Sequence, residues 1–226
     1  HASLLCYDLM NEPVVPGAPR PAGDWLGPPF AGKHFVQFIT LDPAGRDRAA
    51  IASDWIQTLT TAIRRHDRRT LITVGLVDWS LERPGLQSGF VPARIAPGVD
   101  FLSVHLYPKA GQVESAVETL RGFSVGKPVV IEETFPLSAP MPEFTRFLEA
   151  SHSIASGWLG FYWGRPPAEL QASKDIPSAL TRAWLEYFQG HPQPVMPGHQ
   201  TRRLEGWTVL ISERLLDRKS TRLNSS

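Results

Sequence analysis

Two segments of this sequence carry carboxylates that could act together in acid–base or nucleophilic chemistry. Asn11-Glu12-Pro13 follows a short apolar run near the start of the chain, and Glu132-Glu133 closes another apolar run much later. Two carboxylates that face each other across a pocket can cleave an acetal: one protonates the leaving oxygen and the other attacks the anomeric carbon. A separation of about 5–5.5 Å between the two carboxyl groups gives retention of configuration.

Polar and aromatic side chains close two further apolar runs. His105 and Tyr107 stand two residues apart and would lie on one side of a strand, and Trp163 ends the run Leu159 to Trp163. Histidine and tyrosine can orient carboxylates and set their pKa values, and tryptophan offers a flat apolar face for a sugar ring. The structural alternatives are a core histidine, core packing of the tryptophan and, for Glu12, an ordinary surface carboxylate.

The elements that must position these groups are short and continuously apolar, as in strands buried on both faces. The predicted strands are Leu4 to Tyr7, Leu71 to Val74, Phe101 to Val104, Val129 to Ile131 and Leu159 to Trp163. Helical periodicity marks Ala49 to Arg65, Ser115 to Leu120, Pro142 to Ser156 and Pro177 to Gln189. The alternation predicts an α/β fold with a parallel sheet, in which the strand ends meet at one pocket.

Composition narrows the classes of protein that remain. The chain has 226 residues, 42% hydrophobic and 20% charged, with a net charge of +1, which is enough for one core or part of a larger domain. Neither a nucleic-acid partner nor an anionic membrane is indicated, and no apolar run is long enough to span a bilayer. The single cysteine, Cys6, excludes an intrachain disulfide. No histidine spacing suits a metal and no phosphate-binding loop occurs, so we expect no metal and no cofactor.

Four segments together resemble a known family. "YDLMNEP", "VDFLSVHLYP", "GKPVVIEETF" and "GFYWG" are similar to strands four, six, seven and eight of clan A glycoside hydrolases, most of all to the cellulase-like glycoside hydrolase family 5. The resemblance covers roughly Leu4 to Gly190. It implies a (β/α)8 TIM barrel that hydrolyses β-linked glycosides by double displacement, with an oligo- or polysaccharide as substrate and no cofactor.

The resemblance also implies a role for each matching residue. Glu12 would be the acid/base and Glu133 the nucleophile, Asn11 would bond the 2-hydroxyl of the sugar, and Trp163 would be the stacking platform. His105 and Tyr107 would line the subsite where cleavage occurs, with Tyr107 bonding the nucleophile.

The choice between Glu132 and Glu133 is open on periodicity alone, because adjacent residues of a strand point to opposite faces. The family pattern Lys-Pro-x-x-x-Glu-Glu favours Glu133. The chain departs from the family just beyond this point, where Thr134-Phe135-Pro136 stands in place of a frequent glycine. That departure would reshape the loop after this strand.

The resemblance places strand four at the start of the chain, so we expect strands one to three to be missing. Residues 1–190 would then be a partial catalytic barrel, and residues 191–216 a truncated extension or linker. The last ten residues, DRKSTRLNSS, match the translation of a common sequencing adapter and are expected to be an artefact. We expect the 226 residues alone to be inactive. Localisation stays open, and a secreted or periplasmic protein is compatible with the sequence.

Two other functions remain as alternatives. A carbohydrate-binding pseudoenzyme on the same barrel would keep sugar stacking and lose turnover, although both carboxylates are present. A lyase or aldolase on a (β/α)8 barrel would need a Schiff-base lysine or metal ligands at strand ends, and Lys127 precedes its strand at the opposite face. The glycan, endo or exo action and the oligomeric state are not specified by the sequence.

Overall fold

A computed structural model describes residues 4–14, 29–190, 199–204 and 207–212. Five parallel strands form one sheet in the order β1-β2-β3-β4-β5. Their bounds are Cys6–Asn11 for β1, Leu71–Val77 for β2, Leu102–His105 for β3, Val129–Thr134 for β4 and Ala155–Gly160 for β5. The predicted α/β class and parallel sheet are confirmed, and the arrangement is consistent with part of a (β/α)8 barrel.

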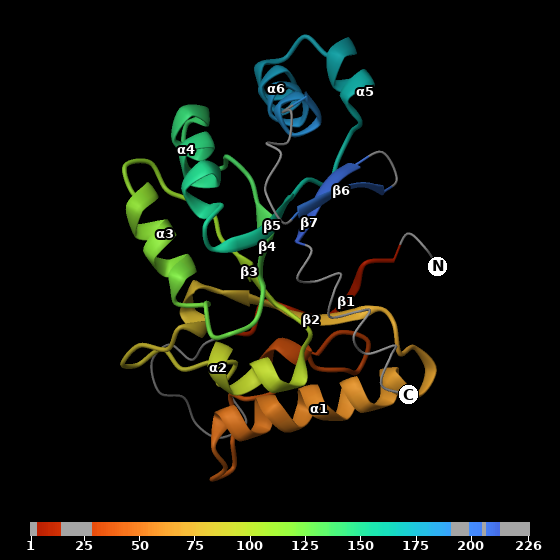
Figure 1. The fold of residues 1–226 in the computed structure, drawn as a ribbon, viewed down its shortest axis with the longest axis vertical. Coiled ribbons are helices and arrows are strands. Elements are labelled where there is room, and N and C mark those ends of the chain that lie inside the picture. The colour runs from red at the N-terminus through yellow and green to blue at the C-terminus, as the bar shows by residue number, and fades with distance from the viewer. Residues whose placement is uncertain (1–3, 15–28, 191–198, 205–206, 213–226) are drawn as a thin grey trace.

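Helices alternate with these strands along the chain (Figure 1). The α-helices are α1 (Arg48–His66), α2 (Pro92–Ile95), α3 (Val113–Arg121), α4 (Met141–Ser151), α5 (Pro167–Ala172) and α6 (Ile176–Gly190). Short 3-10 helices are η1 (Val36–Phe38), η2 (Asp78–Ser80) and η3 (Ala96–Gly98). The described helices include none that is long and apolar enough to cross a membrane.

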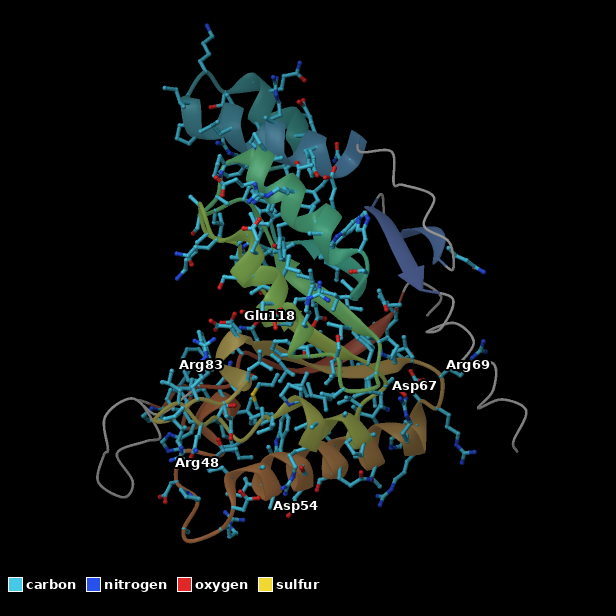
Figure 2. The ribbon with its side chains drawn as sticks, turned by 60° about the vertical axis from the view of Figure 1, so that its left-hand side comes forward. Arg48, Asp54, Asp67, Arg69, Arg83 and Glu118 are labelled. Carbon is cyan, nitrogen blue, oxygen red and sulfur yellow. The ribbon has the colours of Figure 1, made fainter. Side chains whose placement is uncertain are left out.

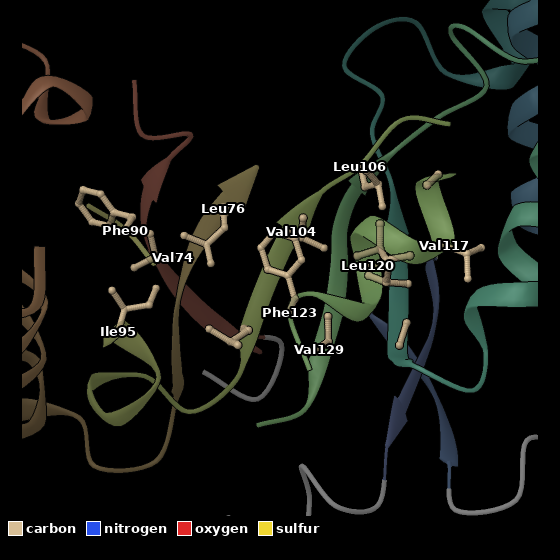
Figure 3. Close-up of a cluster of buried hydrophobic side chains, with 14 of the residues drawn as sticks. Val74, Leu76, Phe90, Ile95, Val104, Leu106, Val117, Leu120, Phe123 and Val129 are labelled. Carbon is tan, nitrogen blue, oxygen red and sulfur yellow. The ribbon is translucent and has the colours of Figure 1, made fainter. Parts of the chain in front are cut away.

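One face of the sheet packs against the helices and forms the main core. Its strand residues include Val74, Leu76 and Val104, which lie close to Phe90 and Phe123 from the connecting segments (Figure 3). All seven residues of β2 are buried, as its continuous apolar sequence predicts. The opposite face of the sheet carries polar side chains toward the carboxyl ends of the strands, where the candidate site lies.

The parallel pairing brings the strand ends to one level. Val77 pairs with His105 across β2 and β3, and His105 pairs with Glu133 across β3 and β4. The register between β3 and β4 shifts immediately before His105, between Val104 and His105. Such irregularities redirect side chains near functional sites.

Three predicted elements have wrong boundaries. Strand β1 is Cys6–Asn11 rather than Leu4 to Tyr7, strand β5 is Ala155–Gly160 rather than Leu159 to Trp163, and α4 ends at Ser151 rather than at Ser156. The amide of Phe161 donates to the carbonyl of Thr134 at 2.9 Å, immediately beyond the end of β5. The aromatic run Phe161-Tyr162-Trp163 therefore lies after the strand, although its composition is typical of a strand.

A separate two-stranded antiparallel sheet follows α6. It consists of β6 (His199–Leu204) and β7 (Trp207–Ser212), and β7 lies beside β5. These strands were not predicted and fall within the segment expected to be an extension or linker. Residues 217–226, the expected artefact, lie outside the described residues.

Charged side chains surround the outer surface of the helices and loops. Figure 2 shows Arg48, Asp54, Arg83 and Glu118 at the periphery of the molecule. Helix α1 is capped at its start by Asp47, whose carboxylate accepts from the amides of residues 49 and 50 at 3.3 and 3.2 Å. Glu132 and Glu133, on the polar face of the sheet, are by contrast largely shielded from solvent.

Candidate active site

Glu12 follows the last residue of β1, and its backbone is strained. Its φ is +54°, in the left-handed region that non-glycine residues rarely adopt. Pro13 adds a second restriction, because a residue before proline favours extended backbone. The amide of Glu12 donates to the carbonyl of Gly75 on β2 at 3.0 Å, which holds this conformation in place. A strained residue that the surroundings hold in place is typical of a functional position.

The turn after Glu12 is anchored from two other elements. The indole Nε1 of Trp79, in η2, donates to the carbonyl of Pro13 at 2.8 Å. The amide of Val14 donates to the carbonyl of Gln37, in η1, at 3.0 Å. Trp79 thus ties the segment after β2 to the turn that carries Glu12.

The strain at Glu12 leads to a prediction about stability. Glu12→Gly should be more stable than Glu12→Ala by about 1 kcal/mol, because glycine adopts positive φ without the steric cost that alanine meets. For a chain of this size the difference corresponds to about 2–4 °C in Tm. Both variants lack the carboxylate, so each is the control for the other in thermal unfolding. An equal or higher Tm for the alanine variant would contradict the left-handed backbone.

His105 lies between the two carboxylates that the sequence singled out. Its Nδ1 is 3.1 Å from Oε1 of Glu12 and 3.2 Å from Oε2 of Glu133. The imidazole is 3% exposed, whereas the side chains of Glu12 and Glu133 are 36% and 15% exposed. We call Glu12 and Glu133 the upper pair. One oxygen of Glu12 lies within 4.8 Å of one oxygen of Glu133.

Tyr107 is bonded to one member of the upper pair. Its hydroxyl donates to Oε1 of Glu133. Desolvation, followed by the hydrogen bond to Glu133, raises the pKa of Tyr107 above its ordinary value. The phenol therefore stays protonated at neutral pH and remains a donor to this carboxylate.

Asn11 and Trp163 are placed differently from this cluster. Asn11 is exposed at the end of β1, next to Glu12. Trp163 is 97% exposed in the loop between β5 and α5, where it lines a pocket of about 290 Å³ with Tyr162, Arg165 and Leu185. The residues that line this pocket include neither Glu12 nor Glu133, and the expected stacking role of Trp163 stays a prediction.

Thr134-Phe135-Pro136, the segment at the end of β4 where the sequence departs from the family pattern, is packed against other aromatic residues. Phe135 is 3% exposed. Its ring stacks on Tyr162 at a centroid distance of 6.1 Å and on Phe188 at 5.5 Å, and meets Trp184 edge-on at 5.4 Å. The loop after β4 is thus packed against α6 and against the segment that carries Trp163.

Two further carboxylates, Asp8 and Glu132, lie on the same face of the sheet below the upper pair; we call them the lower pair. Oδ1 of Asp8 accepts from the amide of Gly75 at 2.7 Å and from the amide of Met10 at 3.3 Å. Glu132 is bonded to the hydroxyl of Ser103 through one oxygen, whereas its Oε2 is buried with no partner among the described residues.

Burial dominates the electrostatics of the lower pair. Desolvation raises the pKa of Glu132 to about 7, with the charge of Asp8 as the next cause. Desolvation likewise raises the pKa of Asp8, against two backbone hydrogen bonds that lower it. Asp8 is exposed as a residue because β1 is the outer strand of the sheet, but its carboxylate lies against Gly75 and His105. Sequence reasoning gave Asp8 no role and treated Glu132 only as the rival nucleophile.

Gly75 makes this close arrangement possible. A Cβ at this position would lie 2.7 Å from Nε2 of His105 and 3.0 Å from Oδ2 of Asp8. The missing side chain lets the imidazole and the carboxylate approach the backbone of β2. An isolated glycine inside an apolar strand is a signal that something approaches the backbone closely.

The carboxylates of both pairs and His105 lie close enough together to be possible ligands of a metal ion. Asp8, His105 and Glu132 form one set, and Glu12, His105 and Glu133 form another, each with donor atoms within 4.8 Å. Acidic groups often gather in this way without an ion, and His105 is common to both sets. The geometry assigns no metal, and the expectation that none is needed remains a prediction.

Comparisons with known proteins give little beyond the geometry. No protein-family model matches the sequence, and no curated protein matches it. Among solved structures, the chain is similar to exo-beta-1,4-mannosidase Op5Man5 from Opitutaceae bacterium strain TAV5, at 16% sequence identity and a TM-score of 0.43. The match covers 78% of this chain and 33% of that protein, so the chain spans a third of its length. A likeness at this TM-score carries no inference about fold or activity.

Proposed function

We propose that this chain carries the catalytic carboxylates of a retaining β-glycoside hydrolase, with Glu133 as nucleophile and Glu12 as acid/base. The observation that supports this most directly is His105, which contacts both carboxylates through one ring nitrogen and holds them within 4.8 Å. Their exposures also suit the two roles. Glu12 is the more open of the pair and can reach a leaving group and then water.

In the first step of the proposed reaction, Oε2 or Oε1 of Glu133 attacks the anomeric carbon. The bond to the glycosidic oxygen breaks, and Glu12 transfers its proton to that oxygen, so the leaving sugar departs as an alcohol. The hydroxyl of Tyr107, a donor to Glu133, would keep the nucleophile oriented toward the sugar. The product of this step is a glycosyl ester of Glu133.

In the second step Glu12, now a carboxylate, takes a proton from water while that water attacks the anomeric carbon. The ester bond breaks, Glu133 leaves as a carboxylate, and Glu12 is protonated again. Two inversions give overall retention. The left-handed backbone of Glu12 and its anchors at Gly75 and Pro13 would hold the carboxylate in place for both steps.

The finer assignment to glycoside hydrolase family 5 and to a cellulase-like activity belongs to the same proposal. A (β/α)8 barrel has eight parallel strands and the described sheet has five, so the proposal requires three more strands between β5 and β1. Activity should therefore be measured on the protein made from the complete reading frame, with the 226-residue chain assayed beside it.

The test is the stereochemistry of hydrolysis. The protein is incubated with a panel of β-linked gluco- and manno-oligosaccharides, and the first product is followed by proton NMR before it mutarotates. The β-anomer should appear first. Initial release of the α-anomer would exclude a double displacement. Binding of these glycans without any hydrolysis would instead favour the carbohydrate-binding pseudoenzyme.

A further inference from the structure

The lower pair is not used by the proposed reaction, yet it lies directly against the residue that joins the upper pair. An oxygen of Asp8, an oxygen of Glu132 and a ring nitrogen of His105 all lie within 4.8 Å of one another. His105 is thus shared by two pairs of carboxylates. Each pair combines one residue at or just beyond β1 with one on β4.

We propose that Asp8 and Glu132 act as a single charge-setting unit, which shares one proton at neutral pH and, through His105, controls how firmly the upper pair holds its own proton. Both residues would be positioning residues, since neither touches the reacting atoms. The second half of this inference rests on the proposed function. The first half, the shared proton, does not.

The shared proton follows from the surroundings of Glu132. Two carboxylates this close in a desolvated place cannot both ionise easily, and one of them keeps its proton to unusually high pH. The buried Oε2 of Glu132 lacks a hydrogen-bond partner among the described residues, which would be costly for a charged carboxylate. The raised pKa of Glu132, about 7, agrees with this geometry.

The route to the upper pair is the imidazole of His105. Its Nδ1 contacts Glu12 and Glu133, while its Nε2 lies on the side of Gly75 and Asp8. The ring is 3% exposed, so water screens little of the interaction across it. A change in the charge of the lower pair should therefore change how readily the upper pair loses a proton.

The charged and titratable groups that face Glu132 come from three strands. Asp8 faces it from β1, His105 from β3, and Glu133 is its neighbour on β4. The other two strands of the sheet, β2 (LITVGLV) and β5 (ASGWLG), contain no titratable side chain. Protonation of this region thus depends on the two pairs and His105, because Tyr107, which contacts Glu133, keeps its proton at neutral pH.

The first experiment needs no substrate. A carboxyl whose pKa is raised on folding stabilises the protein fully below its unfolded pKa, and this contribution is lost as pH rises through the folded value. For Glu132 that window runs from its ordinary value of 4.5 to about 7. We therefore measure Tm from pH 4 to pH 8 for the 226-residue chain and for its Glu132→Gln variant, which stays neutral throughout.

The expected result is a difference in Tm that grows with pH. The Glu132→Gln variant should gain at least about 3 °C on the unsubstituted chain between pH 4.5 and pH 7, with no further gain above. Glu118→Gln, on the exposed side of α3, should show no such trend. A difference in Tm that does not change with pH would overturn the shared proton, since a purely structural effect has no reason to follow this titration.

The second experiment follows the pH profile of kcat/KM in the protein from the complete reading frame. Once its shared proton is lost at alkaline pH, the lower pair carries two negative charges, and the single variants Asp8→Asn and Glu132→Gln each leave one. A nearby negative charge makes the proton of the upper pair harder to lose. The alkaline limb should therefore move to lower pH by about 0.5–1 unit in each single variant. The double variant should move it further.

The two experiments separate the possible failures. An alkaline limb that stays in place in all three variants would overturn the link through His105, even where the Tm test supports the shared proton. If the unsubstituted protein hydrolyses no glycan, the proposed function fails and the link to catalysis fails with it. The Tm series still decides the shared proton in that case.

Discussion

Replacing Glu133 with glutamine should lower kcat for glycan hydrolysis by at least about 10⁴-fold, because the amide cannot attack the anomeric carbon. The neighbours of Glu133 would remain, since the hydroxyl of Tyr107 and Nδ1 of His105 contact its two oxygens from separate directions. We expect a change in Tm of no more than a few degrees. Initial rates and thermal unfolding of the protein from the complete reading frame provide the measurement.

The matched control is Glu118→Gln, the same substitution on α3, where the side chain is 80% exposed and pairs with Arg121. Its kcat should equal that of the unsubstituted protein. Normal turnover by the Glu133→Gln variant would contradict the assigned nucleophile. If Glu132→Gln abolished turnover at every pH while Glu133→Gln did not, Glu132 would be the nucleophile and the lower pair would need another interpretation.

The parallel sheet could be predicted because each of its strands contains or adjoins a short, continuous apolar run. Strand β2 is buried at every position, so the run Leu71 to Val77 has no alternation to mislead its assignment. Polar residues stand out at the ends of such runs. Their positions alone predict that Glu12, His105, Tyr107 and one of Glu132 and Glu133 meet at one edge of the sheet, whereas the choice of Glu133 came from the resemblance to a family. The structure does bring Glu12, His105, Tyr107 and Glu133 together.

The lower pair could not be predicted, because its existence depends on register. Asp8 and Glu132 approach each other only because β1 to β4 pair as they do and Gly75 leaves room beside His105. The distance between Asp8 and Glu132 could be predicted neither from their spacing in the sequence nor from the resemblance to a family. The available signals were a charged residue inside a strand, Asp8, and a glycine in the neighbouring strand, Gly75.

The position of Trp163 was predicted wrongly because the end of its strand was predicted wrongly. The run Leu159 to Trp163 has the composition of a strand, and β-propensity mainly reflects a fit to a half-buried surface. The sheet pairing ends at Gly160 instead, and Trp163 is 97% exposed in the loop that follows. Propensity identified the segment correctly and its boundary wrongly, and that boundary decides whether the indole reaches the upper pair.

Glu12→Gln should give a different kinetic pattern from Glu133→Gln, because the acid/base is needed to different degrees by different leaving groups. For natural glycans, whose leaving group is an alcohol, the loss of general acid catalysis should cost about 10²–10⁴-fold in kcat. The nitrophenolate of a nitrophenyl glycoside leaves without protonation as Glu133 attacks the anomeric carbon, so the first step with this substrate should be nearly as fast as before. Its second step lacks the general base, and the glycosyl ester of Glu133 should accumulate.

The measurement is a stopped-flow trace of nitrophenol release, which should show a burst that approaches one equivalent per active site, followed by slow turnover. The amide at residue 12 keeps the same backbone strain and can still lie beside His105, so a general loss of structure is not expected. An equal fall in rate for both leaving groups, with no burst, would mean that Glu12 positions the substrate but transfers no proton. In that case the acid would have to be sought elsewhere around the site, and the strained turn at Glu12 and Pro13 would need another explanation.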